Sequence, residues 1–290
     1  MTTAARPVRL GPRASAALAL VSLTGVAAFG WPLLASAQTS VDHAAEAPWL
    51  FALLLPLLLA VLMGVLFDGR AAEDAGTAAD RSTGAALPAA AGVDAKSIAM
   101  LGVLAAVGAA LRPLGAGTAG LEPMFFLLIV ASRVLGPGFG FVLGATTMFA
   151  SALLTGGVGP WLPFQMLSMG WVCLGAGLLP GAERLRGRAE VWLLASYGVI
   201  AAFAYGLIMN FQGWPLTTRG LPSDLAFVPG GAVGENLGRF LAYCLATSMG
   251  WDLGRALTTF ACTLVVGAPV LKALRRATRR AAFGTPVRFE

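Results

Sequence analysis

Long apolar runs separated by short polar segments are the dominant pattern along this 290-residue chain. A helix needs about 20 apolar residues to cross about 30 Å of hydrocarbon. We therefore expect an all-α integral membrane protein, with a six-helix bundle preceded by two extra transmembrane helices. The predicted spans are residues 14–34, 49–67, 97–111, 124–135, 139–154, 161–179, 191–211 and 253–271.

Breaks in this pattern divide the chain into four parts. Residues 1–67 are an N-terminal extension with two transmembrane helices, and residues 68–95 are a linker rich in Ala, Gly, Asp and Thr, typical of a flexible cytoplasmic connection. Residues 96–280 are expected to form a six-helix membrane domain, and residues 281–290 a C-terminal tail. Within the domain, Gly136-Pro137-Gly138 and residues 156–160 predict turns.

The segment 236–249 is only partly apolar and carries Arg239. It fits a helix at the membrane surface or over a pocket. Alternatively, it joins the last span to make one long tilted helix. Gly250 breaks the pattern, and Asp252 is a plausible N-cap for the last span.

Basic residues predict the orientation. With eight spans, most of them fall on one side, so the positive-inside rule places both termini of this multi-pass plasma-membrane protein in the cytoplasm. These residues include Arg6, Arg9, Arg13, Arg133, Arg184, Arg186, Arg188, Lys272, Arg275, Arg276, Arg279 and Arg280. The opposite side has mainly Arg112 and Arg219, with Arg239 near it. Ala35-Ser36-Ala37 resembles a signal-peptidase site, but the first apolar run is longer than the usual signal h-region, which favours an uncleaved anchor.

Composition agrees with a bilayer protein. The chain is 57% hydrophobic and 12% charged, against about 45–50% and about 25% in soluble domains. The net charge of +6 is explained by topology, so we expect no nucleic-acid partner. Three separated cysteines without a CxxC spacing and a single histidine predict no metal site.

Catalytic motifs are absent from the sequence. It has no phosphate-binding GxxxxGK[ST] loop, no HExxH and no GxSxG. We therefore expect neither enzymatic activity nor a cofactor, and the chain alone cannot hydrolyse ATP. The acidic residues Glu122, Asp224, Glu235 and Asp252 map to external span ends, which suits ligand contact better than a proton relay.

Two groups of residues are candidates for function. Small residues at four-residue spacing in the helix at 97–111 allow a second helix to approach closely, either within this chain or from a separate subunit. The candidate docking residues are Gly102, Ala105, Ala106 and Ala109.

Polar and aromatic residues gather at external span ends, as a pocket for a small organic ligand requires. The candidate substrate-binding residues are Glu122, Gln165, Trp171, Asn210, Trp214, Arg239, Asp252 and Arg255. The tryptophans also fit an interfacial belt, and Asp252 with Arg255 fits a simple i, i+3 pair.

Residues 96–280 resemble the substrate-binding S component of energy-coupling factor (ECF) transporters, of the actinobacterial type. The resemblance is carried by Ala105 and Ala109 in an AxxxA pattern and by the order of four segments. These read LEPMFF, VLGPGFGFVLGA, GPWLPFQMLSMGW and YGLIMNFQGWP, and a last helix with a basic tail follows them.

The resemblance implies a subunit that binds a vitamin or related micronutrient from outside and delivers it inward. It implies a transmembrane coupling subunit, docked on the AxxxA helix, and two ABC ATPases as partners. Cobalamin is the favoured substrate, with riboflavin second. The two N-terminal helices depart from the family's usual six. A self-sufficient secondary transporter, a membrane enzyme acting on lipid and a non-transporting membrane scaffold are the alternatives.

Overall fold

A computed structural model of the chain describes residues 12–30, 95–115, 119–181, 185–217 and 220–281. The predicted second span at 49–67, the linker up to residue 94 and residues 282–290 of the tail lie outside the described residues. The described residues form helices and contain no strand. The long helices are α1 (Pro12–Phe29), α4 (Ala95–Leu111), α5 (Pro123–Leu135), α6 (Pro137–Thr155), α7 (Leu162–Leu178), α8 (Arg188–Gly213), α9 (Val233–Thr247) and α10 (Met249–Ala281). Two short 3-10 helices, η2 (Pro113–Gly115) and η3 (Trp214–Leu216), follow α4 and α8.

The helices agree closely with the apolar runs. Each of the six helices expected between residues 97 and 271 is present, with ends shifted by a few residues except at the C-terminus of α10. Four of the described segments, Lys96–Gly115, Pro137–Thr155, Arg188–Gly213 and Met249–Arg280, are long and apolar enough to cross a membrane. The apolar helices at Ser15–Phe29, Pro123–Leu135 and Leu162–Leu178 are shorter. The fold is therefore helical and compatible with a membrane protein.

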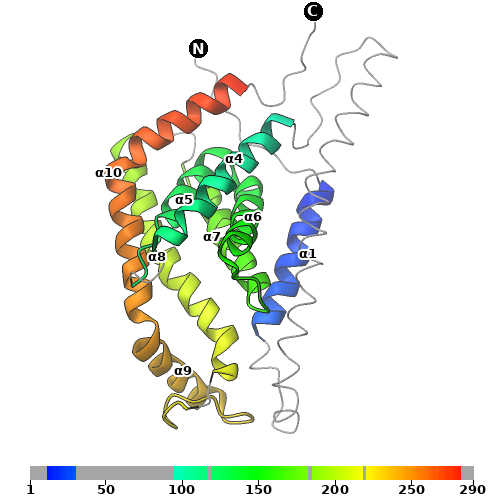
Figure 1. The fold of residues 1–290 in the computed structure, drawn as a ribbon, viewed down its shortest axis with the longest axis vertical. Helices are drawn as coiled ribbons and strands as arrows, with labels where there is room; N and C mark the ends of the chain where they lie inside the picture. Colours follow the sequence, from blue (N-terminus) through cyan, green and yellow to red (C-terminus); the bar gives the residue numbers. More distant parts are fainter. Residues whose placement is uncertain (1–11, 31–94, 116–118, 182–184, 218–219, 282–290) are drawn as a thin grey trace, which may run out of the picture.

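Helix α5 forms the centre of the bundle. It has 13 residues, and 11 of these are buried. Its neighbours are α4, α6, α7, α8 and α10, as Figure 1 shows. A helix of this length spans about 20 Å, and its apolar side chains are covered on all sides by other helices.

Glycines bring α6 and α7 together. A Cβ atom at Gly144 would lie 2.6 Å from the carbonyl oxygen of Met169, and one at Gly140 would lie 2.8 Å from that of Cys173. No side chain fits at either position, so the backbones can approach closely. This is the packing that a GxxxG spacing provides in apolar surroundings.

The segment 236–249 is a helix of its own rather than a continuation of the last span. Helix α9 ends at Thr247 and α10 begins at Met249, with Ser248 between them. The expected break at Gly250 is wrong, and Asp252 lies inside the first turn of α10 instead of capping it. Its backbone amide donates to the carbonyl of Ser248 at 3.0 Å, so one more turn of helix forms than the sequence suggested.

Helix α10 also continues beyond the expected end at residue 271. It contains Pro269 and runs to Ala281. The helix rises along the bundle and then turns across its end (Figure 1). An interior proline removes one backbone hydrogen bond and clashes with the preceding turn, which is the usual cause of such a bend.

An ion-pair network fastens the end of the bundle opposite α9, which we call the basic end. Arg133 of α5 donates to Glu190 of α8 at 3.1 Å, and Arg275 of α10 donates to the same carboxylate oxygen at 2.5 Å. The side chains of Arg133 and Glu190 are fully buried. Arg133 also donates to the carbonyls of Leu179 and Pro180 at 2.5 and 3.0 Å. One carboxylate thus holds three helices together.

Helix α1 packs on the outside of the bundle against α7 and α8. Trp171 of α7 donates to the hydroxyl of Ser22 at 3.1 Å. Phe29 lies edge-on to Phe164, with 4.7 Å between ring centroids. The N-terminal helix is therefore attached to the domain by specific side-chain contacts.

Glu190→Gln tests the network at the basic end. The change leaves two arginines, one of them fully buried, without a compensating charge, and removing one partner of a buried pair costs about 3–5 kcal/mol. We expect a lower midpoint of thermal unfolding in detergent. Glu235→Gln makes the same change at an exposed position of α9 and should leave the midpoint unchanged. Equal midpoints for E190Q and the wild type would contradict the structural role of Glu190.

Candidate functional site

The site begins at the turn that precedes α5. Ala119 and Gly120 adopt positive φ values of 51° and 89°. A Cβ atom at Gly120 would overlap the carbonyl of Trp251, and one at Gly254 would overlap the carbonyl of Ala119. The turn therefore lies directly on the first turns of α10. This contact places Glu122, the N-cap of α5, beside α10.

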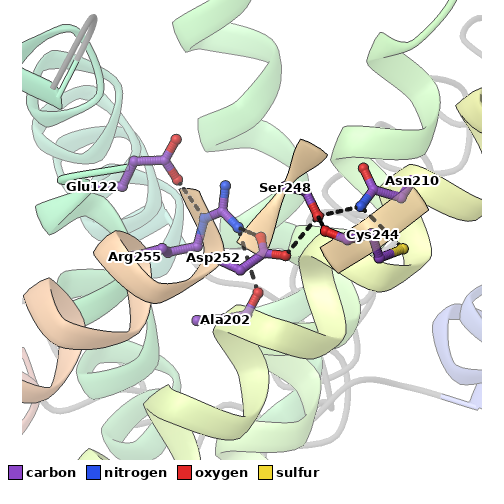
Figure 2. A network of polar contacts seen from close by, with 7 residues as sticks. All are labelled: Glu122, Ala202, Asn210, Cys244, Ser248, Asp252 and Arg255. Atoms are coloured by element: carbon purple, nitrogen blue, oxygen red, sulfur yellow. Dashed lines mark hydrogen bonds and ion pairs between the residues drawn. The ribbon is translucent and has the colours of Figure 1, made fainter. Parts of the chain in front are cut away.

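Arg255 of α10 lies at the centre of the site. Its Nε donates to Oε2 of Glu122 at 2.8 Å, and its Nη1 donates to Oδ1 of Asp252 at 2.7 Å. Nη1 also lies 3.5 Å from the carbonyl oxygen of Ala202 in α8. Figure 2 shows the guanidinium between the two carboxylates. One cation therefore links α5, α8 and α10.

Two aromatic rings flank the same guanidinium. Its central carbon lies 5.2 Å from the ring centroid of Phe125 and 5.1 Å from that of Tyr205. The negative faces of aromatic rings attract cations at this distance, and more strongly where water is excluded. The two rings also pack edge to face, 5.1 Å apart. Arg255 is therefore held by charge, hydrogen bonds and aromatic contacts together.

A chain of polar contacts continues from Asp252 toward α9 (Figure 2). The hydroxyl of Ser248 lies 3.2 Å from Oδ2 of Asp252. Asn210 of α8 donates to that hydroxyl at 2.6 Å and lies 3.5 Å from the sulfur of Cys244. Ser248 is the single residue between α9 and α10, so these contacts fix the joint between the two helices.

The site differs in exposure from the network at the basic end. Asp252 and Arg255 are buried, whereas 23% of the Glu122 side chain is exposed. Two carboxylates share one guanidinium, and a second cation, Arg112, lies near the ring of Tyr205. Glu122 is thus the most accessible charged group of this network, and a hydrogen-bond donor or a cation is the chemistry that suits its carboxylate.

A second, smaller core holds the loop between α8 and α9. Trp214 is almost fully buried, packs against Phe227 and Phe240, and donates to the carbonyl of Leu225 at 2.7 Å. Asn236 accepts from the amide of Val228 and donates to its carbonyl. Arg239 donates to the carbonyl of Ser223. Trp214 and Arg239, predicted as ligand contacts, therefore fasten this loop.

The two clusters meet at Cys244. Its side chain belongs to the small core around Trp214, and its sulfur is the neighbour of Asn210. The loop and the Arg255 network are thus parts of one continuous assembly at the α9 end of the bundle.

The remaining two predicted site residues lie on α7. The indole of Trp171 donates a hydrogen bond to Ser22 of α1. Gln165 has a buried side-chain oxygen without a hydrogen-bond partner among the described residues. The structure brings together Glu122, Asn210, Asp252 and Arg255 and links Trp214 to them through Cys244. Arg239 contacts the loop, and Trp171 lies outside the network.

The predicted docking residues divide between two faces of α4. Ala105 and Ala109 are buried within the bundle, where α4 packs on α6. Gly102 and Ala106 are exposed, and a Cβ atom at Gly102 would meet no atom within 4 Å. The expectation that all four face a partner is therefore wrong for Ala105 and Ala109, because α4 turns these two toward its own domain.

The sequence interpretation missed Phe125, Tyr205 and Ser248 as parts of the site, and it did not single out Glu190 as a buried partner of arginine. Ser248 and Asp252 are four residues apart, a spacing that puts them on one helix face. Phe125 and Tyr205 had no comparable signal, since each lies in an apolar run. Among the described residues there is no group of three or more His, Cys, Asp or Glu side chains that could hold a metal ion.

Comparisons with protein-family models, curated proteins and solved structures find no match to this chain.

Gly206→Ala tests whether close packing maintains the Arg255 network. A Cβ atom at Gly206 of α8 would overlap the carboxylate of Asp252. The displaced Asp252 would lose Arg255, at a cost of about 1–3 kcal/mol, measured as a lower thermal midpoint. Gly213→Ala, in the same helix, meets no atom within 4 Å and should leave the midpoint unchanged or raise it, since alanine favours helix. Identical midpoints for the two variants would contradict this account.

Proposed function

We propose that this chain is the substrate-recognition subunit of an ECF-type ABC importer, binding a vitamin or related micronutrient. The observation that carries the proposal is the Arg255 network with its partly exposed Glu122. It joins polar and aromatic side chains from α5, α8 and α10 at one end of an apolar bundle. Ligand sites combine apolar walls with a few convergent polar groups in this way.

The proposed topology places the α9 end outside the cell. Four membrane-length helices support insertion in the bilayer. Arg186 and Arg188 precede or begin α8 at the basic end, and the basic part of α10 also lies there. With both termini in the cytoplasm, the positive-inside rule assigns this end to the cytoplasm. The six helices from α4 to α8 and α10 form the S-component-like bundle, and α1 belongs to the additional N-terminal pair.

ATP hydrolysis is assigned to other subunits. The sequence has no phosphate-binding loop, so the proposed ATP-driven import uses separate ABC ATPases and a membrane coupling subunit. The coupling subunit is proposed to dock on the exposed face of α4, at Gly102 and Ala106. Small exposed residues let another helix approach closely within the bilayer.

Cobalamin is the first candidate substrate and riboflavin the second. Both follow from the resemblance of residues 96–280 to S components. The partly exposed carboxylate of Glu122 adds one requirement. The substrate must present a hydrogen-bond donor or a positive charge to Glu122.

A self-sufficient secondary transporter is the second candidate function. The observation that favours it is the burial of two carboxylates, Glu190 and Asp252, between helices, because intramembrane acids mark ion pathways in many transporters. Both carboxylates are paired with arginine. Such a transporter would take up substrate without any ATPase, and uptake would stop when the proton gradient is dissipated.

Mass spectrometry of the detergent-purified protein tests the proposed function. We expect a vitamin-sized molecule to co-purify with the wild type. Asn210→Ala should weaken its binding by about tenfold, because the loss of a hydrogen bond in a charged network costs about 1.5 kcal/mol or more. Ser196→Ala, an exposed truncation on the same helix, should bind as the wild type does. Unchanged affinity in N210A would remove Asn210 from the site. Uptake by this chain alone in liposomes would contradict the ATP-driven mechanism.

A double substitution tests the docking face. Gly102→Leu with Ala106→Leu adds bulk where the bundle leaves open space. We expect loss of co-purification with the coupling subunit and the ATPases, with ligand affinity retained. Ala261→Leu, a similar change at an exposed position of α10, should keep the complex intact. Co-purification of the double variant with the coupling subunit and the ATPases at wild-type yield would place the docking face elsewhere.

A further inference from the structure

The last part of α10, residues 270–281, has an inward face that belongs to the core. After Pro269 the helix turns across the basic end of the bundle (Figure 1). Leu271, Leu274 and Thr278 are buried, and both leucines join the main hydrophobic core. Their spacing of three and four residues defines one face of the helix. This face packs on the bundle and anchors the segment.

Arg275 fixes the rotation of this segment about its axis. Its guanidinium reaches the buried carboxylate of Glu190 at 2.5 Å. Because Leu271, Leu274 and Arg275 all point inward, the other basic side chains of the segment point away from the bundle. Lys272, Arg276, Arg279 and Arg280 are all exposed. We call these four residues the basic face.

The basic face has no counter-charge within the part of the chain that the structure describes. The four ion pairs found there involve Arg133, Arg255 and Arg275 as cations, and none involves the basic face. Lys272, Arg276 and Arg280 follow one another at four-residue spacing, and like charges at that spacing repel each other and destabilise a helix. An external anion relieves this repulsion.

The position of the basic face in the chain indicates which kind of anion lies next to it. Val265 and Val266, which lie just before Pro269, are exposed apolar residues on the long span of α10. The helix thus passes from an exposed apolar surface to an exposed basic surface within a few residues. Where a span leaves the hydrocarbon, the adjacent layer is the lipid headgroup region.

We propose that the basic face binds the phosphate groups of anionic phospholipids at the membrane surface. Guanidinium groups match phosphate oxygens in charge and geometry. Clusters of four or more basic residues beside a span gain about 1 kcal/mol for each residue near an anionic surface. The binding holds the end of α10 against the leaflet, and with it Arg275 in place on Glu190. The inference is independent of the substrate and of the ATPases, and it requires only that α10 spans a membrane.

Native mass spectrometry of the full-length protein, titrated with phosphatidylglycerol or phosphatidylcholine in detergent, tests this proposal. We expect the wild type to retain phosphatidylglycerol in preference to phosphatidylcholine, and added salt to reduce the preference. The variant with Lys272→Gln, Arg276→Gln, Arg279→Gln and Arg280→Gln should lose the preference, because it has no cation on this face to pair with the lipid phosphate. The charge-conserving variant with Lys272→Arg, Arg276→Lys, Arg279→Lys and Arg280→Lys should keep it.

Equal retention of the two lipids by the wild type would overturn the proposal. A glutamine variant with the wild-type preference would overturn it as well, and would leave the basic face for an acidic protein partner. If the glutamine variant does not fold, the relative retention of the two lipids by the wild type tests the proposal by itself. A preference that persists unchanged at high salt would show that the contact is not electrostatic, and the proposal would then be wrong.

Discussion

The arrangement of the bundle depends on arginine–carboxylate pairs at both ends of α5. Glu122 and Arg133 are separated by about 16 Å along the helix, and each pairs with groups on neighbouring helices. Charges in apolar surroundings are strongly destabilising unless they are paired. A sliding motion of α8 along α5 would break the Arg133–Glu190 pair, and one of α10 would break the Arg255–Glu122 pair. The three helices therefore have one low-energy register, and the other helices pack around them.

Arginine–carboxylate pairs form the network at each end of the bundle, but the two networks differ in exposure. At the basic end, Glu190 and Arg133 are fully buried, and two backbone carbonyls complete the contacts of the arginine. At the α9 end, Glu122 remains partly exposed, and the network continues through Ser248 to the joint between two helices. The basic end is thus closed and structural. The α9 end combines a fixed cation with an accessible carboxylate and a loop attached by Trp214, and the proposed ligand site lies there.

Small residues have two distinct roles that depend on the face they occupy. Gly140 and Gly144 allow α6 and α7 to touch, and Ala105 and Ala109 face the interior. Gly102 and Ala106, on the same helix as those alanines, face outward. The outward pair is the part of the pattern that is available to a second membrane subunit.

The sequence by itself determined the helices, because apolar runs of sufficient length have no other stable form in a bilayer. It also placed Asp252 and Arg255 together, since i, i+3 neighbours meet on any helix. Only the tertiary structure decided that Arg255 reaches Glu122, 133 residues away in the chain, that Trp214 closes a loop, and that Ala105 and Ala109 face inward. The physical reason is that an almost uniformly apolar helix carries little information about its rotation. The packing of glycines, rings and ion pairs between helices supplies that information.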